Sequence, residues 1–252
     1  FGIVEGITEW LPVSSTGHII LLDEFIRLNA SEEFKSMFDV VIQLGAILAV
    51  IVLFFHKLNP FAFRTKTKQE RKATWVLWFK VCVAILPSGI LGVLFDDWMD
   101  AHLHKGIPVA IALIVYGIAF ILVERRNQGK YSRAITDVHD IDYKTALMIG
   151  LFQCLSLVPG TSRSGSTISS GLLLGYSKEY MVTYSFILSI PAILGACVLD
   201  IPEIIAAGMV YSWPVIIAGL VSSAIVGFLA IRLIRYLVIN DKFIVFSYYT
   251  FI

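Results

Sequence analysis

The sequence predicts an all-α polytopic membrane protein with about six transmembrane helices and two re-entrant helical hairpins in an inverted-topology repeat. Three observations predict this class: the composition, a series of long apolar stretches, and two broken apolar segments that resemble each other. Hydrophobic residues make up 57% of the chain and charged residues 15%, with a mean hydropathy of +0.79. Soluble domains are about half apolar and a quarter charged, so most of this surface faces lipid.

The charge and the cysteines exclude two other classes. A net charge of +1 gives no reason to expect a nucleic-acid partner, because binding to the phosphate backbone requires a concentrated basic face. Cys82, Cys154 and Cys197 lie in apolar stretches without the spacing of a zinc site or a disulfide framework. We interpret them as packing residues.

Six stretches are apolar enough for membrane spans, which need about 20 residues. The last of them is short and ends with the chain. They are Phe38–Phe55, Trp75–Phe95, Ile107–Val123, Met181–Leu199, Trp213–Ile231 and Phe243–Ile252.

The loops between these spans differ in charge. His56–Ala73 is rich in lysine and arginine, and Glu124–Asp142 opens with Arg125 and Arg126. Cytoplasmic loops carry an excess of basic residues, so these two loops are expected in the cytoplasm. The acidic connections Asp96–Lys105 and Asp200–Tyr211 then lie outside.

This alternation holds only if two further apolar segments, Gly2–Leu22 and Leu147–Gly175, do not each cross the membrane once. Both are interrupted at a proline by hydroxyl residues and glycines. Broken backbone is tolerated in a membrane only where it is buried or lines a wet cavity. We therefore predict two re-entrant hairpins.

The hairpins form an internal repeat. Gly2–Glu5 matches Gly150–Gln153, and Leu11–Thr16 matches Val158–Arg163 with a one-residue slip. Three predicted crossings separate the hairpins, an odd number, so they enter from opposite faces. Residues 1–252 then form one integral membrane domain, with residues 1–125 as the first inverted repeat and 145–252 as the second. Such repeats place anionic ligands near the midplane, at the N-termini of broken helices.

Glu5 and Glu9 share one face of a helix at i and i+4 spacing, within an otherwise apolar stretch. Carboxylates inside the membrane point to function. Their expected role is to hold a divalent cation, Mg²⁺ or Ca²⁺, since hard cations take oxygen ligands and bridge to phosphates. The alternative is a pair of carboxylates at a wet helix end.

Arg163 is the one cation between Leu147 and Tyr176. Its planar guanidinium is suited to bind two phosphate oxygens at once. Alternatively it pairs with Glu5 or Glu9 and ties the repeats together. The two roles are compatible in turn, as an ion pair without ligand and a phosphate clamp with it.

Hydroxyl residues surround these charges. Ser14, Ser15 and Thr16 in one hairpin and Ser162, Arg163 and Ser164 in the other are suitable helix starts that would face an anion, or would only cap their helices. His18 follows Ser15 by three residues and would reach the same cavity to activate a nucleophile or protonate a leaving group. The alternative for His18 is a structural histidine. Gln43, on the same helical face as Asp39, lines the cavity or bonds across a helix interface.

Two motifs together, Glu5–His18 and Pro159–Thr167, resemble those of the bacterial undecaprenyl-diphosphate phosphatase family associated with bacitracin resistance. The stretch Phe38–Val50 also fits, and the resemblance spans the chain. It implies hydrolysis of undecaprenyl diphosphate to undecaprenyl phosphate, the lipid carrier for peptidoglycan. It also implies a bacterial cytoplasmic (inner) membrane location, with the active site facing the outer side.

The resemblance assigns the family's glutamate motif to Glu5 and Glu9, its serine and histidine to Ser15 and His18, and its arginine motif to Ser162, Arg163 and Thr167. We expect catalysis from Ser15, His18, Glu9 and Arg163, with Ser15 as the first choice of nucleophile and His18 as its base or a proton donor. Attack by His18 itself or by water stays open. The expected substrate-binding residues are Ser14, Thr16, Ser162, Ser164 and Thr167.

A polyprenyl-phosphate transporter is the alternative, since inverted repeats with broken helices are typical of secondary transporters. The nucleophile and carboxylates gathered within Glu5–His18 favour an enzyme, because translocation needs no nucleophile. The expected partners are a polyprenyl diphosphate lipid and the bilayer, and a homodimer is also considered. A purely structural scaffold would leave Glu5, Glu9 and Arg163 unexplained.

Overall fold

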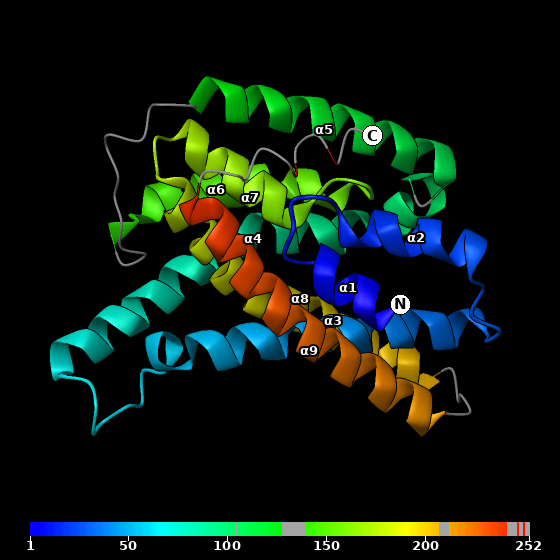
Figure 1. Ribbon diagram of the computed structural model, residues 1–252, viewed down its shortest axis with the longest axis horizontal. Coiled ribbons are helices and arrows are strands. Elements are labelled where there is room, and N and C mark those ends of the chain that lie inside the picture. The colour runs from blue at the N-terminus through cyan, green and yellow to red at the C-terminus, as the bar shows by residue number, and fades with distance from the viewer. Residues whose placement is uncertain (104, 128–139, 207–211, 241–245, 247–248, 250–252) are drawn as a thin grey trace.

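The computed structural model describes residues 1–103, 105–127, 140–206, 212–240, 246 and 249. Within these ranges the chain is helical and is connected by turns (Figure 1). In chain order the helices are α1 (Gly2–Thr8), α2 (Ser15–Phe25), α3 (Glu32–Leu58), α4 (Lys68–Leu103), α5 (Gly106–Asn127), α6 (Tyr143–Gln153), the 3₁₀ turn η3 (Cys154–Leu157), α7 (Arg163–Leu173), α8 (Lys178–Ala206) and α9 (Trp213–Ile239).

Five of these helices, α3, α4, α5, α8 and α9, contain segments long and apolar enough to cross a membrane. They coincide with five of the six predicted spans, and the protein is a multi-pass membrane protein as predicted. The sixth predicted span, Phe243–Ile252, lies outside the described residues except for Phe246 and Tyr249.

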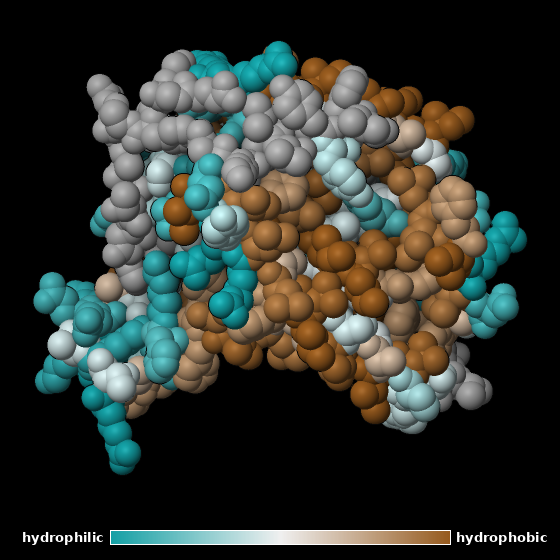
Figure 2. Space-filling model, viewed as in Figure 1, coloured by the Kyte–Doolittle hydropathy of each residue, from teal (hydrophilic) through white to brown (hydrophobic). Residues whose placement is uncertain are grey.

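The surface agrees with this class (Figure 2). Hydrophilic residues gather at the lower left, where Figure 1 places the α3–α4 connection, and along the right edge. A broad hydrophobic surface separates the two polar ends. The long helices run between these ends, as spans of a bilayer would.

Helix α3 shows why these spans begin and end where they do. The Ser31 hydroxyl accepts a hydrogen bond from the Phe34 amide at 3.3 Å, which caps one of the unpaired amides of the first turn. Glu32 and Glu33 lie in the first turn, and His56 and Lys57 in the last. Both pairs complement the helix dipole, so the charges that end the span also stabilise its ends.

Small residues let the helices approach closely. A Cβ atom on Gly45 of α3 would lie 2.4 Å from the Leu220 carbonyl oxygen of α9, and one on Gly6 of α1 would lie 2.7 Å from that of Ser223. The Ser223 hydroxyl donates to the Ile42 carbonyl at 2.6 Å. Such contacts drive association where lipid offers no hydrophobic gain. They pack α9 onto both α1 and α3.

Each predicted hairpin consists of two short helices joined by a turn, α1–α2 and α6–α7. Helix α1 packs on α9, and α6 packs on α4, where a Cβ on Gly150 would lie 2.2 Å from the Ala84 carbonyl oxygen. Both second helices begin where the sequence indicates: Ser14 caps α2 and Ser162 caps α7. Each serine oxygen accepts from the amide three residues on, of Gly17 and Gly165, so Ser14 corresponds to Ser162.

This correspondence corrects the one-residue slip proposed for the two turns, which would pair Ser14 with Thr161. The slip is confined to the turn. One residue separates Pro12 from Ser14 in the first hairpin, whereas two residues separate Pro159 from Ser162 in the second. The helix cap therefore aligns the two hairpins better than the prolines do.

The hairpins return to opposite ends of the bundle. Helix α2 leads directly to the start of α3, whereas α7 leads to Lys178, which forms a buried ion pair with Glu124 near the end of α5. In Figure 1, α2 ends at the right, near the start of α3, and α6 begins at the left. An inverted repeat would require this arrangement, and the repeat boundaries at 125 and 145 stay a prediction.

Candidate active site

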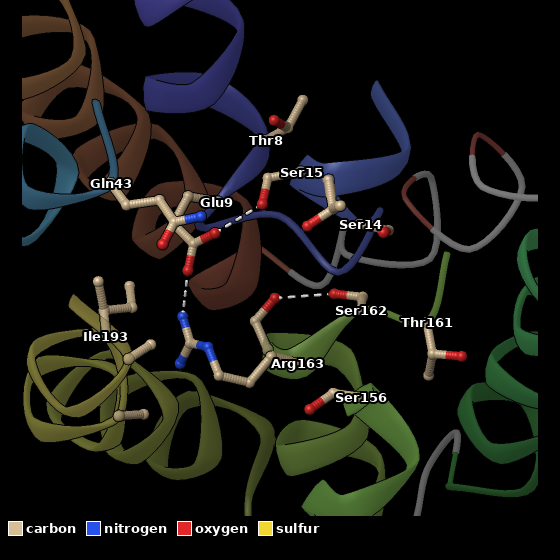
Figure 3. A pocket seen from close by; sticks show the side chains of 14 residues that line it. Thr8, Glu9, Ser14, Ser15, Gln43, Ser156, Thr161, Ser162, Arg163 and Ile193 are labelled. Carbon is tan, nitrogen blue, oxygen red and sulfur yellow. Dashed lines mark hydrogen bonds and ion pairs between the residues drawn. The ribbon is translucent and has the colours of Figure 1, made fainter. Parts of the chain in front are cut away.

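A cavity of about 260 Å³ lies where the two hairpin turns meet α3 and α8. Hydroxyls, one carboxylate, one guanidinium and a short apolar wall surround it (Figure 3). The lining residues are Thr8, Glu9, Ser14, Ser15, Thr16, Gln43, Ser156, Thr161, Ser162, Arg163, Ser164, Ala192, Ile193 and Ala196.

Glu9 and Arg163 join the hairpins across this cavity. The Nη2 of Arg163 donates to Glu9 Oε1 in a direct ion pair. The Arg163 side chain is only 16% exposed and the Glu9 side chain 10%. Arg163 Nη1 also donates to the Ser185 carbonyl of α8 at 3.3 Å. The alternative role of Arg163, as the link between the two hairpins, is thus realised with Glu9.

Ser15 is held against the same carboxylate. Its hydroxyl donates to Glu9 Oε2 at 2.7 Å, so one Glu9 oxygen contacts Ser15 and the other contacts Arg163 (Figure 3). A carboxylate in this position orients the hydroxyl and can accept its proton. The group in contact with Ser15 is therefore Glu9.

His18 is directed elsewhere. Its Nδ1 lies 2.7 Å from the Ser14 carbonyl oxygen, and its Nε2 lies 3.0 Å from the Tyr249 hydroxyl, with the two rings stacked. The structure does not place His18 among the cavity residues. A base role for His18 toward Ser15 would require this ring to turn.

Ser14 has an unusual backbone. Its φ of 64° is the one positive φ outside glycine among the described residues, a conformation that is strained for an L residue. Its side chain nevertheless accepts from the Gly17 amide at 3.3 Å. Strain of this kind often gathers at functional sites, and here it turns the chain so that α2 points its N-terminus at the cavity.

The second hairpin is held against the first by Ser164, whose hydroxyl donates to the Leu11 carbonyl at 2.9 Å and lies 3.1 Å from the Ser162 hydroxyl. The N-termini of α2 and α7 therefore meet at one cavity, and both carry amides that attract anions. Thr167 lies one turn further along α7, fully buried, where its hydroxyl donates to the Arg163 carbonyl at 3.0 Å. It does not line the cavity.

Glu5 lies behind Glu9, only 2% exposed, and its Oε1 has no hydrogen-bond partner. A buried carboxylate oxygen without a partner is costly, so this atom suits a cation. Among the described residues no cluster of three or more His, Cys, Asp or Glu side chains is arranged to hold a metal. Carboxylates such as those of Glu5 and Glu9 are the oxygen ligands that Mg²⁺ or Ca²⁺ takes.

Several cavity residues were not predicted from the sequence. Ser156 lies at the same offset from Thr8 as Ser162 from Ser14, so the internal repeat, aligned on the helix caps, would have found it. Ala192, Ile193 and Ala196 of α8 carried no such signal, because small apolar residues in an apolar span look alike. Gln43, for which two roles were open, lines the cavity.

Together, these features define a multi-pass membrane protein with a polar cavity between two broken helices and a serine hydroxyl held by a carboxylate. Comparison with known proteins identifies the family. The family described as bacitracin resistance protein BacA matches residues 1–252, and the chain belongs to this family.

Similar proteins from bacteria carry one name. An undecaprenyl-diphosphatase of Enterococcus faecalis is 50% identical over 252 residues, covering 98% of this chain and 90% of that protein. An undecaprenyl-diphosphatase of Streptococcus mutans is 49% identical over 253 residues, covering 99% and 89%. Another from Enterococcus faecalis is 59% identical over 196 residues, covering 77% and 71%.

Proposed function

We propose that this protein hydrolyses undecaprenyl diphosphate to undecaprenyl phosphate and inorganic phosphate. The observation that carries the proposal is the contact of one carboxylate, Glu9, with both a serine hydroxyl and an arginine at a cavity between two helix N-termini. The relatives and the family favour the hydrolase over a transporter. The activity would renew the lipid carrier for cell-wall synthesis and oppose bacitracin.

Binding of the terminal phosphate would begin with Arg163. The Arg163 guanidinium exchanges part of its pairing with Glu9 for phosphate oxygens, and the first-turn amides of α2 and α7 add further donors. Phosphoryl transfer depends mainly on such positioning and charge neutralisation. The partial burial of Arg163 and Glu9 strengthens these interactions.

The chemical step follows from the contact between Ser15 and Glu9. The Ser15 hydroxyl attacks the terminal phosphorus while Glu9 accepts its proton, and the anhydride bond breaks with undecaprenyl phosphate as the leaving group. Water then cleaves the phosphoserine and releases phosphate. Direct attack by water, with Ser15 only binding phosphate, and a role for a reoriented His18 are the alternatives to be tested.

A divalent cation belongs to the proposal. Glu5 and Glu9 would hold Mg²⁺ or Ca²⁺, which when bound neutralises diphosphate charge. The unpartnered Glu5 Oε1 supports this assignment.

The test measures phosphate release from a long-chain polyprenyl diphosphate by the purified full chain, with Mg²⁺, Ca²⁺ or EDTA. The variants are Ser15→Ala, His18→Ala, Glu9→Gln and Arg163→Ala, with Ser36→Ala on the exposed face of α3 as a matched control for serine loss. We expect the Glu9, Arg163 and Ser15 variants to lose most activity and the control to keep it. Binding of polyprenyl phosphate without any release by the folded wild type would contradict the hydrolase.

A phosphoenzyme assay separates the nucleophiles. Acid quenching during turnover should trap a phosphoserine at position 15. The Ser15→Ala variant should yield no phosphoserine there. Phosphate retained on His18 after a parallel alkaline quench, under which phosphohistidine survives, would replace the Ser15 assignment. Water-derived oxygen incorporated in a single step, with no phosphoenzyme after either quench, would replace it with direct attack by water.

We also propose that the protein lies in the inner membrane, with the basic α3–α4 connection in the cytoplasm and the cavity open to the outer side. Thr16 is exposed and lines the cavity. In a background without Cys82, Cys154 and Cys197, a Thr16→Cys variant should react with an impermeant maleimide added outside intact spheroplasts. Labelling only in inverted vesicles would reverse the orientation.

A further inference from the structure

The connection between α3 and α4 is folded into a fixed turn by its own hydrogen bonds. The Asn59 side chain accepts from the Phe61 amide at 2.8 Å, and the Lys66 amide donates to the Ala62 carbonyl at 2.9 Å. The Lys66 ammonium donates to the carbonyls of Lys57 and Asn59 and to the Thr74 hydroxyl, at 3.0, 3.1 and 3.0 Å. The turn therefore presents its other side chains in a defined arrangement.

The turn displays large aromatic side chains at the end of two spans. Phe61 is 61% exposed and Phe63 70% exposed, and Phe61 packs edge-on against the partly exposed Trp75 ring at 5.5 Å. Aromatic residues so placed are typical of the membrane–water interface, where one side of the ring meets acyl chains. The turn therefore reaches toward the headgroup layer.

The charge of this region has one sign. Residues 56–73 contain six lysines and arginines and one acid, Glu70. The Glu70 carboxylate already accepts from the Thr67 amide at 2.7 Å and from the Thr67 hydroxyl at 2.8 Å. Arg64, Lys68 and Lys72 are exposed, and the Arg71 guanidinium lies 4.3 Å from the centre of the Phe63 ring. An anion approaching the turn meets a positive surface.

A cavity of about 410 Å³ lies in this surface, separate from the cavity between the hairpins. Its walls combine apolar rings with polar donors. They are Phe55, His56, Asn59, Phe61, Ala62, Phe63, Arg64 and Thr65. A phosphodiester needs such donors, and the glycerol and upper acyl carbons attached to it need the rings.

We propose that the cavity of the α3–α4 turn binds the headgroup of an anionic phospholipid of the adjacent leaflet. The Arg64 guanidinium takes the phosphate, Thr65 and His56 border it, and Phe61 and Phe63 contact the acyl ends. Clusters of basic residues beside spans attract anionic lipids of the adjacent leaflet. The lipid would fix the end of the span that carries Gln43 to the active-site cavity.

The test places the full chain in nanodiscs of equal parts phosphatidylcholine and phosphatidylglycerol, re-extracts it in mild detergent, and counts retained lipids by native mass spectrometry. We expect retention of phosphatidylglycerol over phosphatidylcholine. Arg64→Gln and Arg71→Gln should each weaken it roughly fivefold, which corresponds to about 1 kcal/mol per charge. Phe63→Ser should reduce retention of both lipids.

Matched variants distinguish a specific lipid-binding site from non-specific attraction of lipids by surface charge. Arg27→Gln removes one exposed cation between α2 and α3, at the other end of the bundle, and should leave retention unchanged. Arg64→Lys keeps the charge without the planar fork and should fall between wild type and Arg64→Gln. Thermal unfolding and phosphate release in detergent report whether each variant is folded.

Three results would overturn the proposal. The first is equal retention of the two lipids by wild type, and the second is an equal loss in Arg27→Gln and Arg64→Gln. The third is complete displacement of phosphatidylglycerol by inorganic phosphate, which would make the cavity a site for soluble anions. None of these results bears on the hydrolase, because phosphate release is measured separately.

Discussion

The first hairpin, α1–α2, and the second, α6–α7, follow one backbone plan but carry different chemistry. Both restart from a serine that caps the next helix, Ser14 or Ser162. The residue after that cap is Ser15 in the first hairpin and Arg163 in the second. One position thus supplies the hydroxyl in one repeat and the cation in the other.

A second pair of positions diverges in the same way. Glu5 and Gln153 correspond in sequence, and each has a buried Oε1 without a partner. The Gln153 amide donates to the Ser88 hydroxyl at 2.7 Å, a neutral contact that fixes α6 on α4. The carboxylate is found in the first hairpin alone. The backbone plan shared by the two hairpins therefore builds the cavity, and the sequence differences between them provide its charges.

The largest expected effect comes from removing the charges that join the hairpins. The double variant Glu9→Gln/Arg163→Gln should release phosphate about 10²- to 10³-fold more slowly than wild type, because a donor to the reacting phosphate is lost. Its stability should stay near wild type, because neutral partners replace the pair. Either single variant should be less stable than the double, since it leaves one charge buried alone.

These variants are compared by phosphate release and by the thermal midpoint in detergent. Near wild-type activity in the double variant would show that the pair only joins the repeats. Arg163 would then have no role in phosphate binding.

The next effect concerns how the second hairpin packs. Gly150→Ala should destabilise the protein by at least 1–3 kcal/mol, the usual cost of overpacking, because its Cβ would lie 2.2 Å from a backbone oxygen. Gly89→Ala is a matched control within a helix, since no atom lies within 4 Å of its Cβ. Thermal unfolding in detergent compares the two, and equal midpoints would mean that α6 can shift on α4 at little cost.

A smaller effect separates the two capping serines. Ser14→Gly should be neutral or slightly stabilising, because glycine relieves the positive φ and is itself a fair cap. Ser162→Gly should lower stability by a few tenths of a kcal/mol or more, since Ser162 has an extended backbone at φ −73° and gains no such relief. Equal midpoints for the two variants would argue against stored strain at Ser14.

The smallest effect depends on pH and lies where the second hairpin begins. The Asp142 carboxylate caps α6 by accepting from the Thr145 amide at 2.6 Å, and this bond lowers the pKa of Asp142. The stabilisation is therefore present above the unfolded pKa and is lost as pH falls through the lower folded pKa. Asp142→Ala should reduce the thermal midpoint slightly at pH 7 and progressively less toward pH 3, whereas an equal reduction at both would contradict the charged cap.

The sequence by itself determined the class of fold, the five confirmed spans and the two helix starts. Hydropathy and capping are local properties: a run of apolar residues must face lipid, and a serine caps the amides that follow it. It also indicated Glu9, Ser15 and Arg163, because charges and hydroxyls inside apolar segments are costly without a purpose. Glu5 and Thr167 were equally visible, but the structure buries both: neither lines the cavity, and Glu5 lies behind Glu9.

Only the tertiary structure decided which of these side chains meet. Glu9 contacts Ser15 and Arg163, His18 turns toward Tyr249, and three small apolar residues of α8 close the cavity. The buried pair of Glu124 and Lys178 joins helices far apart in sequence. Such contacts depend on how α9, α4 and α8 hold the hairpins, and the packing of distant segments sets side-chain directions that no local pattern contains.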